Sequence, residues 1–221
     1  MSTMALVAGD SVDTGGALPH AVHYGLIAIG VVAVCVVGVA HLRGRHGGEA
    51  SPAGRTATED RALPVAERLV VPLALVSSAA AAGVHAAVGP PHFRESVLFG
   101  LFFALTAVLQ LAWAGLLVVR RSRALLVLGA LGNVAVLAVW AVTRTVGLPF
   151  GLLPDPEAVG PWDLACGVWE LVVVASCVVL LRTSHPRGEI ASWQQWHRSV
   201  RVYAGGSVLL LAALAFSGAA S

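Results

Sequence analysis

The sequence predicts an all-α membrane protein, a bundle of six transmembrane helices, and three observations lead to this fold class. Hydrophobic residues make up 57% of the 221 residues and charged residues only 12%, whereas soluble domains have about half and about a quarter. The mean hydropathy is +0.81. Apolar runs long enough to cross a bilayer recur along the chain, and the arginines gather in alternate loops between these runs.

The predicted spans follow one another along the chain. They cover about residues 20–42, 69–88, 97–119, 124–143, 164–181 and 200–220. A polar tail, residues 1–19, precedes the first span. Residues 43–64 are rich in Gly, Pro, Ser and Thr with mixed charge, which predicts a flexible loop that cannot bury itself. Between the second and third spans, Pro90 and Pro91 predict a turn.

The positions of the arginines predict the orientation in the membrane. All 14 cationic residues are Arg, and only Arg94 and Arg144 lie outside the loops after spans one, three and five. Those three loops are therefore predicted to be cytoplasmic, with both termini external to the plasma membrane. The net charge of +2 is too small to predict a nucleic-acid partner. The lipid bilayer is the expected partner, and association with other membrane subunits or with further copies of the chain stays open.

Polar residues in the spans recur at helical spacing. Because a helix advances 100° per residue, positions 7, 11 or 18 apart share a face. The aligned sets are Ser78 with His85; Thr106, Gln110 and Trp113; Asn133, Trp140 and Arg144; and Asp163, Cys166, Glu170 and Cys177. Polar faces are costly in hydrocarbon, so they should point into the bundle. There they act as groups that fix helix packing, a role that suffices for Ser78, Thr106 and Asn133.

Glu170 is the most informative residue, since a carboxylate deep in a span needs a proton or a partner. Three hypotheses stay open. The first is a structural ion pair or hydrogen-bond network of Glu170 with Arg144. The second is a zinc or copper site with His23, His85, His92 and Glu170 as candidate ligands. The third is a proton or ion relay through Glu170 and His85, with Arg144 as charge partner.

A b-type haem cytochrome is a further alternative, because haem held by two histidines needs a facing pair at matched depth. An outer pair would be His23 with His85. An inner pair would be His41 with His197 or His185.

Motifs with known catalytic mechanics are missing from the sequence. It contains no G-x-S-x-G, H-E-x-x-H, G-x-x-x-x-G-K-[ST] or G-x-G-x-x-G in a suitable context. No catalytic residue is predicted. The leading hypothesis is a transport or accessory protein that binds a metal ion or relays protons at an external His/Glu/Arg cluster. The rival is a non-catalytic structural membrane subunit.

Three sequence segments carry a resemblance. They are GVHAAVGPPHF, LFGLFFALTAVLQLAWA and SRALLVLGALGNVAVLAVWAVTRTVGLPFG, between Gly83 and Gly151. Over this third of the chain the sequence resembles a group of multi-pass membrane proteins from actinobacteria. The resemblance implies a membrane location, and it brings no activity, cofactor or site residue to this chain.

Overall fold

The computed structural model describes residues 64–149, 152–183 and 191–216, and these segments form helices without a strand. In chain order the helices are η1 (Ala66–Val70), α2 (Val71–Glu95), α3 (Val97–Val119), α4 (Arg123–Thr145), α5 (Pro161–Thr183), η2 (Trp193–Gln195) and α6 (Arg198–Phe216).

Five of the described helical segments are long and apolar enough to cross a membrane, with η1 and α2 forming one of them. The all-α membrane class is thus confirmed. The predicted tail, first span and following loop lie outside the described residues, and the count of six spans is not confirmed.

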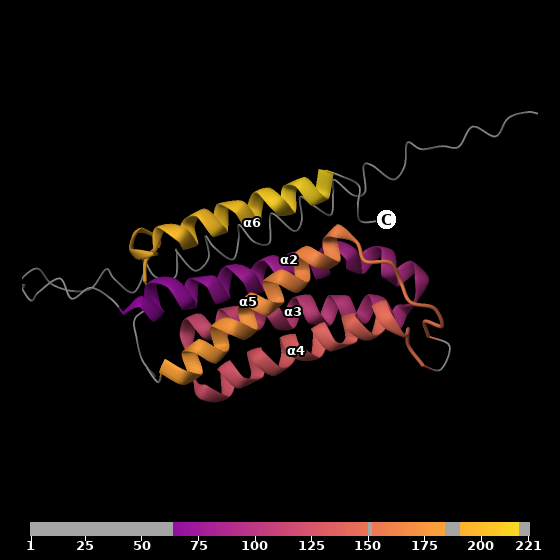
Figure 1. Cartoon of the computed structure of the whole chain (residues 1–221), viewed down its shortest axis with the longest axis horizontal. Coiled ribbons are helices and arrows are strands. Elements are labelled where there is room, and N and C mark those ends of the chain that lie inside the picture. Colours follow the sequence, from indigo (N-terminus) through magenta and orange to yellow (C-terminus); the bar gives the residue numbers. More distant parts are fainter. Residues whose placement is uncertain (1–63, 150–151, 184–190, 217–221) are drawn as a thin grey trace, which may run out of the picture.

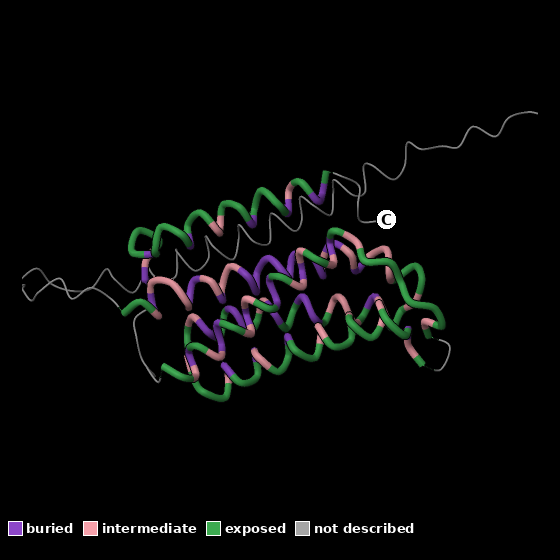
Figure 2. The backbone as a smooth tube through the Cα atoms, viewed as in Figure 1, coloured by how far each residue is buried: buried purple, intermediate pink, exposed green. Residues whose placement is uncertain are grey.

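Helix α2 occupies the centre of the bundle (Figure 1). In its most apolar stretch 67% of the residues are buried, against 17% in α4, and Figure 2 shows the buried positions gathered along it. The run from Ala79 to Gly83 consists of small residues that are all buried. Small side chains let neighbouring helices approach closely, so α2 packs against α3, α5 and α6.

Helix α2 also differs from the sequence prediction at its end. The turn expected at Pro90 and Pro91 does not form, because the helix continues through both prolines to Glu95. The prolines lack N–H groups and cannot bond to the carbonyls one turn earlier. They sit in the last two turns, where few helical bonds remain to be lost, and Ser96 closes the helix with its N–H donating to His92 O at 2.9 Å.

Helices α3 and α4 meet through Trp113. Its Nε1 donates to Leu125 O at 2.8 Å, and its ring lies against Gly129, where a Cβ atom would come within 2.4 Å of the ring. Gly129 therefore sets the distance between the two helices.

Both helices begin at a serine whose Oγ caps the first turn. Ser96 accepts from Leu98 N, and Ser122 accepts from Leu125 N.

The segment between α4 and α5 folds back on the end of α4. Gly147 has φ of 75°, a left-handed conformation that glycine adopts without strain. Leu148 N then donates to Leu153 O at 2.7 Å, and Glu157 N donates to Thr143 O at 3.0 Å. This turn brings the Glu157 side chain over the end of the bundle, beside Arg144.

The opposite end of the bundle carries a buried ion pair that the sequence did not predict. Arg121 Nη1 and Nη2 donate to the two oxygens of Glu67 at 2.6 and 2.7 Å, and both side chains are almost fully buried. Nearby, Arg68 Nε donates to Gln195 O at 2.9 Å.

Helix α6 lies along the outer side of α2 (Figure 1). Two polar contacts attach it: the hydroxyls of Ser77 and Tyr203 lie 2.7 Å apart, and Trp169 Nε1 donates to Ser207 Oγ at 3.1 Å. Much of the helix surface stays exposed.

Candidate metal centre

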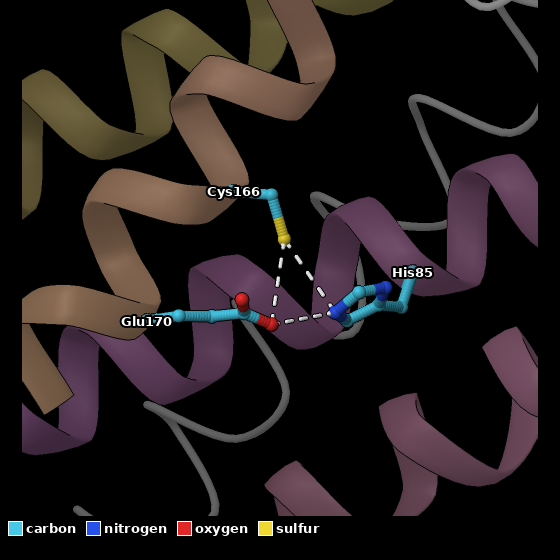
Figure 3. Close-up of side chains that lie close together, drawn as sticks. All are labelled: His85, Cys166 and Glu170. Carbon is cyan, nitrogen blue, oxygen red and sulfur yellow. Dashed lines mark hydrogen bonds and ion pairs between the residues drawn. The ribbon is translucent and has the colours of Figure 1, made fainter. Parts of the chain in front are cut away.

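Three side chains from two helices converge in the interior of the bundle. His85 comes from α2, and Cys166 and Glu170 come from successive turns of α5. Residues four apart lie one above the other on a helix face, so both α5 side chains point toward the imidazole (Figure 3). We call His85, Cys166 and Glu170 the triad. All three are buried, with exposed fractions of 5%, 7% and 2%.

The donor atoms of the triad are close enough to share one ion. His85 Nε2 lies 2.9 Å from Glu170 Oε1, and Cys166 Sγ lies 3.5 Å from Nε2 and 3.9 Å from Oε1. A triangle with these sides has a circumradius of about 2.0 Å, while zinc takes N and O ligands at about 2.0–2.2 Å and S at about 2.3 Å. A zinc ion slightly out of the triangle's plane therefore meets all three bond lengths with little movement.

A hydrogen-bond network holds the carboxylate in place. Gln110 Nε2, from α3, donates to Glu170 Oε1 at 3.2 Å and to Asn133 Oδ1, on α4, at 3.3 Å. Asn133 Nδ2 in turn donates to Gly129 O at 2.8 Å. Four helices, α2 to α5, thus contribute to one buried polar cluster. On the side of Glu170 away from His85, the network consists of side-chain amides and a backbone carbonyl.

A cavity of about 350 Å³ borders the triad. Its walls are mainly apolar and aromatic, and include Phe99, Phe102, Phe103 and Val136. This volume lies in the range of about 300–1,000 Å³ that is usual for small-molecule sites. The triad therefore lies beside a space that can admit a ligand.

Arg144 lines the same cavity but does not contact Glu170 in the way that the sequence led us to expect. Its guanidinium pairs with Glu157 through Nη1 and with Asp163 through Nη2, the second at 2.9 Å. The turn after α4 carries Glu157 back to Arg144, and Asp163 opens α5 beside it. Two nearer carboxylates thus occupy the guanidinium, and the partner of Glu170 is His85.

The remaining candidates differ in position. His92 lines the cavity, but its Nδ1 donates to Val88 O at 2.9 Å and its ring packs on Phe103 with centroids 4.4 Å apart. It does not belong to the group of donor atoms within reach of one ion. His23 lies outside the described residues, as do His41 and His185 of the haem hypothesis.

The described residues contain no facing pair of histidines that could hold a haem. Their histidines are His85, His92 and His197. The first two share one helix, and His197 precedes α6, where its Nδ1 lies 2.8 Å from Ser199 Oγ. Every proposed pair thus needs a histidine from outside the described part of the chain.

Two members of the cluster were missed as site residues. Cys166 was noted only as part of the polar face of its helix, and its spacing of four from Glu170 was the signal that could have identified it as a ligand. Gln110 likewise lay on a recognised polar face. Nothing in the sequence indicates that its amide on α3 would reach Glu170 on α5.

The chain matches no protein-family model, no curated protein and no solved structure. Its function therefore has to be inferred from the chemistry of the site.

Proposed function

We propose that this protein is a multi-pass plasma-membrane protein that binds one transition-metal ion, zinc best, through His85 Nε2, Cys166 Sγ and Glu170 Oε1. The observation that carries the proposal is the convergence of three different metal-ligating groups, with all donor atoms within 4.8 Å of one another. In this role the protein serves metal capture or transport, with no catalytic step assigned.

The donor set favours zinc over copper. Zinc accepts thiolate, imidazole and carboxylate together. Cu(I) favours soft sulfur ligands, while a carboxylate suits harder ions. Three protein ligands also leave the fourth position of a tetrahedral zinc ion open, and all three members of the triad line the cavity.

Charge balance supports a divalent ion at this position. A buried carboxylate without compensation costs several kcal/mol, roughly. With Cys166 as thiolate and Glu170 as carboxylate, the two negative charges match the double positive charge of zinc. The centre is then neutral, which suits surroundings without other cations in contact with Glu170 among the described residues.

The arginine distribution supports an external position for the site. The cavity lies at the end of the bundle formed by Arg144, Glu157 and Asp163, away from the arginine-rich loops that are cytoplasmic by the positive-inside rule. A metal centre here receives its ion from outside the cell.

Metal analysis of the full chain in detergent tests the proposal. After equilibration with zinc and removal of free ion, we expect one zinc per chain in the native protein and in His92→Gln, which alters a cavity histidine outside the triad. The Glu170→Gln and His85→Gln variants should remain folded on size-exclusion chromatography and contain no zinc. A native protein without zinc, or triad variants that keep it, would contradict the proposal.

A structural role is the second candidate, and the four-helix hydrogen-bond network favours it. Under this function Glu170 fixes the register of α2, α3 and α5 through His85 and Gln110. Glu170→Gln separates the two roles. Loss of folded protein with no metal effect supports architecture, whereas a folded protein that has lost zinc supports the metal centre.

A further inference from the structure

The cavity beside the triad has unsatisfied nitrogen atoms that the metal does not explain. Among the described residues, the buried side-chain N–H groups without a hydrogen-bond partner include Trp140 Nε1, Arg144 Nε and Trp162 Nε1. All three residues line this one cavity. A buried N–H without an acceptor costs about 1–3 kcal/mol. Several such N–H groups around one cavity indicate a ligand that supplies hydrogen-bond acceptor atoms.

The charges at the cavity mouth decide what kind of acceptor fits. Arg144 contributes one positive charge, and Glu157 and Asp163, which both pair with it, contribute two negative charges. The net charge of the rim is negative and the Arg144 guanidinium is already paired, so the rim would repel an anionic head group. An uncharged acceptor, such as the carbonyl oxygen of an ester or amide, meets no such repulsion.

The walls of the cavity indicate where the ligand comes from. Leu98 of α3 and Val139 of α4 both line the cavity, and they are 55% and 39% exposed. Among the described residues, the side-chain hydrogen bonds between α3 and α4 come from Gln110 and Trp113. At the cavity both helices instead present apolar side chains that are partly exposed, and in a bilayer such side chains face lipid tails.

We propose that the cavity binds a neutral amphiphile from the membrane, with an ester or amide carbonyl at the donors of Trp140, Arg144 and Trp162 and an apolar chain leaving between α3 and α4. This inference does not depend on the metal centre, because it rests on the unpaired donors, the rim charges and the apolar walls.

Native mass spectrometry of the full chain in detergent tests this site with two probes of equal chain length, 1-monolauroylglycerol and laurate. We expect one monolauroylglycerol per chain and laurate binding at least about tenfold more weakly, since the rim disfavours a carboxylate. Equal binding of both probes would indicate non-specific hydrophobic binding of the alkyl chain and would overturn the proposal.

Two variants locate the binding in the cavity. Val136→Phe fills the cavity wall and should abolish binding, whereas Val134→Phe, at a 47% exposed position on the same helix that does not line the cavity, should leave it unchanged. Trp140→Phe keeps a ring and removes one donor, so the affinity for monolauroylglycerol should fall about three- to tenfold. Unchanged affinity in Trp140→Phe overturns the proposal even if Val136→Phe does not fold.

Zinc content measured on the same samples separates this inference from the metal centre. Val136→Phe and Trp140→Phe should keep zinc, and His85→Gln should lose zinc while still binding the amphiphile. If the protein binds zinc but not monolauroylglycerol, only the amphiphile proposal fails. If it binds monolauroylglycerol but not zinc, only the metal proposal fails.

Discussion

His85 Nε2 and Glu170 Oε1 lie 2.9 Å apart although 85 positions separate the two residues in the chain. The contact ties α2 to α5 in the bundle interior, where an unaccompanied carboxylate would be costly. Cys166 lies one turn from Glu170 and contacts the same imidazole at 3.5 Å. A proton shared by the pair and a metal ion shared by the triad are thus alternative ways of neutralising one site.

The two buried cysteines of α5 should differ in their response to metal. Cys166→Ala removes a ligand, so we expect zinc affinity to fall by at least about a hundredfold, whereas Cys177→Ala should leave it unchanged. Cys177 is a matched control because it is also free and buried, and it does not belong to the triad. Competition with a zinc chelator measures both variants. Equal affinities would exclude the thiolate as a ligand.

Gln110 should act as a positioning residue for Glu170. Gln110→Ala leaves the carboxylate without its amide donor, and outer-shell partners of this kind typically change metal affinity by about 10- to 100-fold. Thr106→Ala, one turn away, removes a hydroxyl that only bonds its own helix at Phe102 O, and should have little effect. The same chelator competition measures both. A purely structural Gln110 would lower thermal stability without changing the affinity of the folded fraction.

Much of the helical architecture could be predicted because it depends on local chemistry. Apolar length fixes the five described spans, and helical spacing places Gln110, Asn133 and Glu170 on polar faces that are buried in the structure. The partners of these residues depend on how the helices turn and cross. Helical spacing alone therefore left open whether Glu170 would meet His85 or Arg144.

The misplaced contacts have identifiable causes. Arg144 was matched to Glu170 because both lay on polar faces, but the turn at Gly147 returns Glu157 to it, and no local pattern predicts that return. Pro90 and Pro91 suggested a turn, yet two prolines near a helix end are tolerated. The Glu67–Arg121 pair was not predicted, since partners on different helices leave no spacing pattern in the sequence.

The Glu67–Arg121 pair should be important for folding. Removing one partner leaves a buried charge, so Glu67→Gln should lower the free energy of unfolding by about 3–5 kcal/mol. The double variant Glu67→Leu with Arg121→Met removes both charges and should recover most of the loss. Unfolding monitored by circular dichroism in detergent measures both. If the double variant is no better than the single one, the loss comes from packing rather than from the missing Glu67 carboxylate.

The proposed orientation can be tested with single cysteines at opposite ends of the bundle. Asp155 and Gln194 are both exposed, in the segment before α5 and in η2. On intact cells, a membrane-impermeant maleimide should label Asp155→Cys above the background of the native protein and should not label Gln194→Cys until the cells are opened. Labelling of Gln194→Cys alone on intact cells would invert the topology and place the metal centre on the cytoplasmic side.

Two glycines of α4, Gly129 buried and Gly132 exposed, should respond differently to the same substitution. A Cβ at Gly129 would lie 2.4 Å from the Trp113 ring, whereas a Cβ at Gly132 would meet nothing within 4 Å. Gly129→Ala must displace the indole and strain its bond to Leu125 O, so it should cost about 1–3 kcal/mol. Gly132→Ala should be neutral or stabilising by up to about 1 kcal/mol, because alanine favours helix. Thermal unfolding of both variants compares them directly. Equal stability would mean that α3 and α4 can separate without loss, and that the spacing between them is not set by Trp113.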